Sequence, residues 1–234
     1  MYNKTKFGTP LAECTRQNGK VMEYVISIII GYLLGSISPA ALISKTKKIN
    51  LRKSGTHNLG ATNTTLVLGK KFGAIVMLFD IAKGALSVII AKLLFKEIAI
   101  VTGLLAGCAS VLGHMFPFYM KFRGGKGLAA YGGMILAFDP IIFLILLVIG
   151  LICAFVFNYG IALTASAATL FPFAVAIRYF HSASLIPLVA MAAVISIVLI
   201  VRHWGNIYRA ATKREMTTKQ FVSRIFGKVK ENNN

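Results

Sequence analysis

Residues 141–177 read IIFLILLVIGLICAFVFNYGIALTASAATLFPFAVAI and contain no charged side chain. Residues 25–43 form a second stretch without charge. Because a helix needs about 20 mostly apolar residues to cross the hydrocarbon core of a bilayer, both stretches predict membrane spans. The whole chain agrees, since 56% of its 234 residues are apolar, only 14% are charged, and the mean hydropathy is +0.72. These values exclude an ordinary soluble domain and predict an all-α integral membrane protein.

Hydropathy predicts seven transmembrane helices. The fourth is short and rich in glycine and alanine, which favours a tilted or partly re-entrant helix. The expected spans are residues 22–44, 72–95, 98–118, 127–138, 141–157, 161–177 and 185–201. The chain then divides into a polar N-terminal extension (1–21), a seven-helix membrane domain (22–216) and a basic C-terminal tail (217–234).

Basic residues predict the orientation. The chain has 26 Lys and Arg against 7 Asp and Glu, and 18 of the basic residues fall in segments 45–71, 121–126 and 202–234. Alternating spans put these three segments on one side, and the positive-inside rule makes that side cytoplasmic. The N-terminus is therefore expected outside and the C-terminus inside. Positive charge between membrane spans points to anionic lipid headgroups or phosphorylated substrates, with no nucleic acid partner.

The tail has the pattern of an amphipathic helix. Basic residues alternate with apolar residues that recur at helical spacing. The apolar residues are Phe221, Val222, Ile225, Phe226 and Val229. Such a helix would lie on the anionic inner leaflet. The alternative is a basic tail that is simply surrounded by water.

Two glycine-containing loops on the expected cytoplasmic side suit phosphate. In residues 51–63, Arg52 can form a bidentate pair with a phosphate, and Thr and Asn side chains can add hydrogen bonds. In residues 121–127, three glycines surround Lys126 just before a helix, a pattern that can form an anion-binding nest of backbone amides. Each loop also has a simpler interpretation, a solvated turn in the first and a flexible hinge in the second.

Three titratable residues within the expected spans are candidates for a functional role. Asp80 and Lys83 share one helix face, and intramembrane charges either form structural pairs or mark function. His114 is the histidine best placed to face a cavity, although a structural role is the commoner one. The sequence lacks a Gly-x-Ser-x-Gly elbow, a His-Glu-x-x-His zinc motif and a His-x4-Asp pair. We therefore expect neither a conventional triad nor a metal site.

Taken together, these motifs resemble those of the bacterial acyl-phosphate:glycerol-3-phosphate acyltransferases (the PlsY family). The resemblance extends over residues 22–216 and its combination of motifs is highly specific. It is carried by Gly35-Ser36-Ile37, Leu51-Arg52, Gly60-Ala61-Thr62-Asn63, Leu68-Gly69-Lys70-Lys71, Asp80-Ile81-Ala82-Lys83-Gly84, Gly113-His114-Met115, Gly124-Gly125-Lys126-Gly127, Asn206-Ile207 and Glu215. The chain departs from the family pattern at His57 and Lys213, where the family has glycine, and at Ala162 and Ala165, where it has serine.

The resemblance implies transfer of a fatty acyl group from acyl phosphate to the 1-hydroxyl of sn-glycerol 3-phosphate, which gives lysophosphatidic acid and phosphate. This is the first step of phospholipid synthesis at the bacterial plasma membrane. The implied partners are the two substrates and membrane lipids, and no metal or nucleotide cofactor is implied. Two alternatives stay open, an organic-phosphate transporter and a catalytically inactive lipid-binding relative.

The resemblance also implies roles for single residues. The expected catalytic residues are Ser36, Arg52, Lys126 and His114. The expected substrate-binding residues are Thr56, Asn58, Gly60, Thr62, Asn63, Lys83, Gly124, Gly125 and Gly127, and Asp80, Asn206 and Glu215 are expected to support the site. Because acyl phosphate has a good leaving group, we expect direct transfer without an acyl-enzyme, with Arg52 or Lys126 stabilising the departing phosphate.

Overall fold

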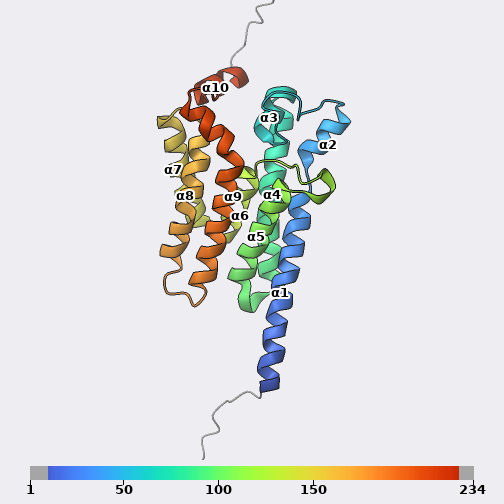
Figure 1. Cartoon of the computed structure of the whole chain (residues 1–234), viewed down its shortest axis with the longest axis vertical. Coiled ribbons are helices and arrows are strands. Elements are labelled where there is room, and N and C mark those ends of the chain that lie inside the picture. Colours follow the sequence, from blue (N-terminus) through green and yellow to red (C-terminus); the bar gives the residue numbers. More distant parts are fainter. Residues whose placement is uncertain (1–9, 227–234) are drawn as a thin grey trace, which may run out of the picture.

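The computed structural model describes residues 10–226 and consists, over that range, of helices and loops without a strand. The long helices run alternately up and down and pack side by side (Figure 1). The elements are α1 (Pro10–Ser36), α2 (Pro39–Thr46), α3 (Ala61–Leu68), α4 (Lys70–Leu94), η1 (Lys96–Ile98), α5 (Ala99–Met115), η2 (Phe118–Met120), α6 (Leu128–Phe138), α7 (Pro140–Val156), α8 (Ile161–Arg178), α9 (Leu185–Ala211) and α10 (Thr218–Phe226). The prediction of an all-α protein is confirmed.

Five helical segments in the described range are long and apolar enough to cross a bilayer. They are Gly19–Thr46, Lys70–Leu94, Lys96–Met120, Ile161–Arg178 and Leu185–Ala211. α6 and α7 are also apolar, but with 11 and 17 residues they are shorter than the about 20 residues of a full span. The bundle exposes large apolar side chains, such as Phe155 and Ile177 with exposed fractions of 82% and 80%. Such a surface is suited to contact with lipid tails.

The first expected span, residues 22–44, is interrupted. α1 ends at Ser36, and α2 begins at Pro39. Proline fits the first turn of a helix but not its interior, because it lacks an amide hydrogen. Ser38 caps the new helix, since its Oγ accepts a hydrogen bond from the amide of Ala41 at 3.3 Å. The expected single helix is therefore two helices.

The last helix is longer than the expected span, residues 185–201, by ten residues at its C-terminal end. α9 continues to Ala211, because the residues that end the apolar run keep the periodicity of an amphipathic helix. This continuation puts Arg202, Asn206 and Arg209 at spacings of four and three, along one face of the helix.

α1 and α5 approach each other closely. A Cβ atom at Gly31 would lie 2.1 Å from the carbonyl oxygen of Ala106, and one at Gly35 would lie 2.0 Å from that of Ser110. No side chain fits at either position, which is the usual reason for a Gly-x3-Gly spacing between membrane helices. The contact fixes the end of α1 against α5.

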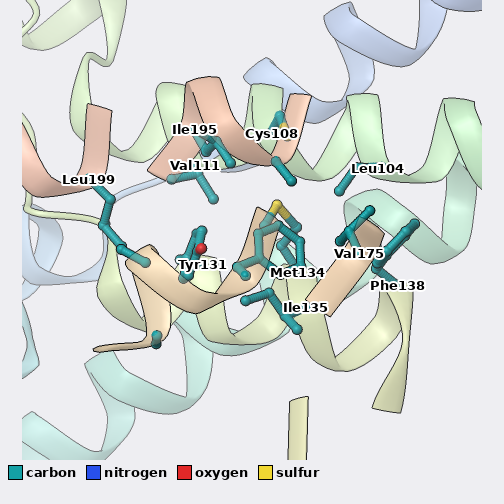
Figure 2. Packing of buried hydrophobic residues seen from close by; sticks show 14 of the residues in the cluster. Leu104, Cys108, Val111, Tyr131, Met134, Ile135, Phe138, Val175, Ile195 and Leu199 are labelled. Carbon is teal, nitrogen blue, oxygen red and sulfur yellow. The ribbon is translucent and has the colours of Figure 1, made fainter. Parts of the chain in front are cut away.

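α6 lies inside the bundle. Figure 2 shows Tyr131, Met134 and Ile135 of this helix among buried side chains of α5, α8 and α9. The Tyr131 hydroxyl also pairs with Ser196 Oγ of α9 at 3.0 Å. Between helices in lipid, packing and such hydrogen bonds supply the attraction. The loop that leads into α6 is therefore attached to a rigid element.

The basic segments 45–71 and 202–234 reach the same end of the molecule. Figure 1 shows α2, α3 and α10 at this end, with the first turns of α1 at the other. α10 is the helix expected in the tail, although residues 227–234 of the tail lie outside the described range. At the opposite end of the chain, residues 10–21 of the expected polar extension are the first turns of α1.

Candidate active site

Two oppositely charged side chains and a histidine form a buried cluster between α4 and α5. Lys83 Nζ lies 2.7 Å from Asp80 Oδ1 and 2.8 Å from His114 Nδ1. It also donates to the carbonyl oxygen of Ile37 at 2.8 Å. An ammonium group has three hydrogens, and these three neighbours are placed to accept them. Lys83 and Asp80 therefore tie the helices together, and the expectation that Lys83 binds substrate stays a prediction.

His114 Nδ1 has two partners, Lys83 Nζ at 2.8 Å and Asp80 Oδ1 at 3.2 Å. It can accept from the ammonium, with the ring hydrogen on Nε2, or donate to the carboxylate, which leaves a lone pair on Nε2. This nitrogen faces the glycine loop, since a Cβ atom at Gly125 would lie 2.2 Å from it. His114 can donate a hydrogen bond from Nε2 in the first arrangement and accept a proton there in the second.

Ser36 is buried at the end of α1, with an exposed fraction of 3%. Its Oγ donates to the carbonyl oxygen of Tyr32 at 2.7 Å, and its own carbonyl oxygen accepts from the Tyr119 hydroxyl at 2.6 Å. Gly113 of α5 lies against it, because a Cβ atom there would be 3.1 Å from Ser36 Oγ. No hydrogen bond within residues 10–226 joins Ser36 to the cations described below.

Asn63 organises the loop between α2 and α3. Its side chain is fully buried, and Nδ2 donates to the carbonyl oxygens of Leu51 and Asn58, both at 2.8 Å. Oδ1 accepts from the amide of Thr56 at 2.6 Å. Both amide hydrogens are used within the protein, so Asn63 shapes the loop, and the expected contact with substrate stays a prediction.

The same loop presents Arg52 at the end of the bundle. Its Nη2 donates to the carbonyl oxygen of Arg123 in the glycine loop, which joins the two basic loops. Arg52 also lines a cleft of about 400 Å³ together with Lys45 and Lys48. The other expected binding residues of this loop are exposed (Thr56, Thr62) or partly exposed (Asn58, Gly60).

The glycine loop, residues 121–127, packs so closely against α5 that side chains would not fit at Gly124 and Gly125. The amide of Gly124 donates to the carbonyl oxygen of Met115 at 2.9 Å, and that of Gly125 to the carbonyl oxygen of His114 at 3.1 Å. A Cβ atom at Gly124 would lie 2.0 Å from the same His114 oxygen. The expected nest of phosphate-binding amides is thus not formed by these two residues, because both amides already have acceptors.

Lys126 starts a chain of polar contacts that reaches α9. Its Nζ donates to Asn206 Oδ1, and Asn206 Nδ2 donates to Glu215 Oε1 at 2.5 Å. Glu215 Oε2 lies 2.7 Å from Arg209 Nε. Burial lowers the pKa of Lys126, and the charges of Arg209 and Arg202 lower it further while Glu215 opposes them. Asn206 and Glu215 thus hold Lys126 in place.

Arg202 is a component of the site to which the sequence interpretation assigned no role. Its Nη2 donates to the carbonyl oxygen of Gly125 at 2.9 Å, and its guanidinium carbon lies 5.0 Å from the centre of the Phe116 ring. Its Nε is buried without a hydrogen-bond partner among the described residues. The available signal was the spacing of Arg202, Asn206 and Arg209, which only becomes a shared face once the last helix is extended.

The arrangement favours an anion over a metal ion. Arg52, Lys126 and Arg202 all bond to the glycine loop or belong to it, and the nearby carboxylate of Glu215 is already paired. Guanidinium and ammonium groups are the usual partners of phosphate. In the part of the chain that the structure describes, no group of three His, Cys, Asp or Glu side chains is placed to hold a metal ion.

Several known proteins are similar to this chain in sequence. A family model described as glycerol-3-phosphate acyltransferase matches residues 25–213. The chain is 37% identical to the glycerol-3-phosphate acyltransferase of Aquifex aeolicus, over 83% of this chain and 98% of that one. It is 38% identical to that of Geobacillus kaustophilus, over 82% and 94%. A shorter match, 46% identical, covers 55% of this chain and 61% of the Exiguobacterium sibiricum protein.

A solved structure agrees with these relatives. The crystal structure of PlsY, described as an integral membrane glycerol 3-phosphate acyltransferase in its glycerol 3-phosphate form, matches with a TM-score of 0.71 and 35% identity. The match covers 83% of this chain and 94% of that chain. The chain therefore belongs to the glycerol-3-phosphate acyltransferase family of integral membrane enzymes.

Proposed function

We propose that this protein transfers a fatty acyl group from acyl phosphate to the 1-hydroxyl of sn-glycerol 3-phosphate, giving lysophosphatidic acid and phosphate. The observation that carries the proposal is the grouping of Arg52, Lys126 and Arg202 at the glycine loop of an apolar helix bundle. Both substrates carry phosphate and one carries an acyl chain, so their site needs cations beside lipid. The PlsY structures, described as glycerol 3-phosphate and lysophosphatidic acid forms, support the same acceptor and product.

Arg52 and Lys126 are proposed to bind the phosphate groups. Each is now held by a neutral oxygen, of the Arg123 carbonyl and the Asn206 amide respectively. A phosphate oxygen is a stronger acceptor for a charged donor, so it can displace either one. The exposed or partly exposed residues of the first loop would surround the bound substrate: Thr56, Asn58, Gly60 and Thr62.

The first turn of α6 is proposed to add backbone donors. The first amides of any helix have no carbonyl partner in a preceding turn, and the helix dipole favours an anion beside them. Gly127 precedes this turn with a φ of +92°, which glycine adopts without strain. Gly124 and Gly125 instead bring the loop against His114, and their absent side chains allow that approach.

The proposed chemistry is a direct transfer. The glycerol 1-oxygen bonds to the acyl carbon, the bond from that carbon to the phosphate oxygen breaks, and the hydroxyl proton passes to a phosphate oxygen. Arg52 or Lys126 neutralises the departing phosphate, an effect of about 3 to 4 kcal/mol in comparable sites. His114 is the side-chain alternative as the acceptor of the hydroxyl proton. Ser36 Oγ, whose hydrogen is held by Tyr32, can accept a hydrogen bond from substrate.

The proposed membrane arrangement has seven spans, with α6 and α7 completing the domain, in a bacterial plasma membrane. The glycine loop and the C-terminus face the cytoplasm, which the position of the basic segments 45–71 and 202–234 at the same end supports. A cysteine at position 121, introduced as Lys121→Cys into a variant without the native cysteines, tests this orientation. It should react with an impermeant maleimide only after the cytoplasmic face is opened. Reaction in intact cells would overturn the arrangement.

The decisive assay uses purified full-length protein in sealed vesicles with acyl phosphate and glycerol 3-phosphate, without coenzyme A or acyl carrier protein. We expect lysophosphatidic acid and phosphate in equal amounts, and a large loss in Arg52→Ala. The adjacent, exposed Lys53 offers a matched control, since Lys53→Ala removes the same charge. Glycerol 3-phosphate uptake without acylation would indicate a transporter. Binding without turnover would indicate an inactive relative, and either result rejects the proposal.

A further inference from the structure

We propose that α10 and the turn before it bind the headgroup of an anionic phospholipid, a function beyond the acyl transfer proposed above. The site is a groove of about 740 Å³ between this turn and the helix. Four cations line it, Lys213, Arg214, Lys219 and Arg224. Figure 1 shows α10 at the end of the bundle, beside the ends of α7 and α9. The family match ends at residue 213, so α10 lies beyond the matched residues.

The charge in the groove is not compensated from within. Glu215 is the carboxylate in its wall, and its two oxygens are already used by Asn206 and Arg209. The remaining polar lining residues, such as Gln220 and Ser223, can hydrogen-bond to oxygen atoms. Cations beside hydroxyl and amide groups match a phosphate with its attached polyol and not an acyl chain.

The groove is a folded part of the protein and not a loose tail. α10 begins with a capping box, in which Thr217 Oγ1 accepts from the amide of Gln220 at 3.2 Å and Gln220 Oε1 accepts from the amide of Thr217 at 3.0 Å. The amide of Thr218 donates to the carbonyl oxygen of Asn158 at 2.8 Å, and that of Lys219 to Asn158 Oδ1 at 3.2 Å. The cations of the groove are therefore held at a defined place.

That place is at the boundary of the lipid. Asn158, to which α10 is anchored, directly follows Phe155, Val156 and Phe157 at the end of α7. These three side chains have exposed fractions of 82%, 67% and 64%. Exposed apolar side chains of a membrane helix face lipid tails, and the next polar layer outward holds the headgroups. Lipid headgroups therefore lie next to the groove, which favours them over a phosphate dissolved in the bulk water.

The test compares two double variants of the full-length protein in detergent. Lys219→Gln with Arg224→Gln removes two cations of the groove, and Lys71→Gln with Lys96→Gln removes two exposed cations elsewhere. Binding of phosphatidylglycerol and of phosphatidylcholine is measured by native mass spectrometry without substrates, so the result does not depend on turnover. We expect several-fold weaker retention of phosphatidylglycerol in the groove variant alone, and equal retention of phosphatidylcholine in all proteins.

Three outcomes would reject the lipid site. The first is an equal loss in both double variants, which would indicate net charge only. The second is displacement of phosphatidylglycerol by millimolar inorganic phosphate or glycerol 3-phosphate, which would make the groove a site for soluble phosphates. The third is failure of the charge-conserving pair Lys219→Arg with Arg224→Lys to retain the lipid, which would indicate damage to the helix. An inactive protein that still binds phosphatidylglycerol would reject the acyl transfer and not the lipid site.

Discussion

The two ends of the bundle differ in the balance between cations and carboxylates. At the end away from α10, Asp139 caps α7 by accepting from the amides of Ile141 and Ile142, at 3.0 and 3.2 Å. Its second oxygen accepts from Arg178 Nε and the Tyr179 hydroxyl, both at 3.2 Å. Burial and the charge of Asp139 raise the pKa of Tyr179 to about 12, so this hydroxyl keeps its hydrogen. Every charge in this cluster has a protein partner.

At the other end the cations exceed the carboxylates. Arg52, Lys126 and Arg202 bond to neutral oxygens of the protein, and Glu215 is shared between Asn206 and Arg209. Neutral partners satisfy the hydrogen bonds of a cation but not its charge. The difference teaches that the balanced cluster stabilises the fold, whereas the unbalanced cluster is the proposed binding site for an anion.

The largest expected effect sharpens this contrast. Lys126→Ala should lower kcat/KM by about 10²- to 10³-fold, because it removes a cation from the phosphate site. The melting temperature of the variant should change little, because Lys126 bonds to a neutral oxygen of Asn206 and not to a carboxylate. Steady-state kinetics and thermal unfolding in detergent check both expectations. A variant that keeps most of its activity would show that the unbalanced charge has another purpose.

The glycine loop offers the next test. Gly125→Ala would put a Cβ atom 2.2 Å from His114 Nε2, so the loop must shift and kcat/KM should fall by about 10²-fold. Gly132→Ala in α6 is the matched control, because its Cβ atom would meet only Phe143 Cε2 at 3.8 Å. The control should retain activity and gain about 0.5 to 1 kcal/mol of stability from the helix. Equal activity in the two variants would contradict the close-packing role.

The balanced end should respond in stability and not in catalysis. Asp139→Ala removes the cap of α7 and the acceptor for Arg178 and Tyr179, and should cost about 1 to 3 kcal/mol of unfolding free energy. Asp139→Asn keeps the cap and loses the charge, so it should cost less. Unfolding measurements together with activity per folded molecule distinguish the two ends. A loss of kcat in Asp139→Ala with unchanged stability would contradict the difference between the two ends of the bundle.

The smallest effect concerns pH. Because the pKa of Lys126 is lowered from 10.5, its charge is lost at a lower pH than that of an exposed lysine, and the KM for glycerol 3-phosphate should rise a few-fold on the alkaline side. Lys126→Arg should move this limb to higher pH. Stability should not fall in parallel, because a lysine whose folded pKa is lowered contributes increasing stability as the pH rises toward 10.5. An identical alkaline limb in Lys126→Arg would assign the titration to another group.

Much of the fold could be predicted because apolar runs and helices coincide in a membrane protein. α4, α5, α7 and α8 begin and end within three residues of the expected spans. The break before Pro39 and the continuation of α9 were missed, since hydropathy measures transfer into lipid and not helix capping or amphipathic periodicity. Ser38 before a proline was a readable signal of the break.

The site was predictable in its residues and less so in their contacts. Lys126, Asn206 and Glu215 do meet, although they come from distant parts of the chain. The sequence could not reveal that Lys83 has three neighbours placed to accept its hydrogens, or that the amides of Gly124 and Gly125 have acceptors, because both depend on how closely α4, α5 and the loop approach. Motifs identify residue types, whereas free donors are a property of the packing.

The shortness of α6 has a consequence for the traffic of substrates. Its 11 residues span about 16 Å, roughly half of a hydrocarbon core, and its far end is tied to α4 by Lys92, which donates to the carbonyl oxygens of Ala137 and Phe138, both at 2.8 Å. In the proposed membrane arrangement, the polar loop that precedes α6 therefore lies below the membrane surface. Extracting an acyl chain into water costs about 0.8 kcal/mol per methylene. If the water-soluble acceptor binds at this depth, the acyl chain of the donor can stay in the lipid during the transfer. The acylated product then already has its acyl chain in the leaflet.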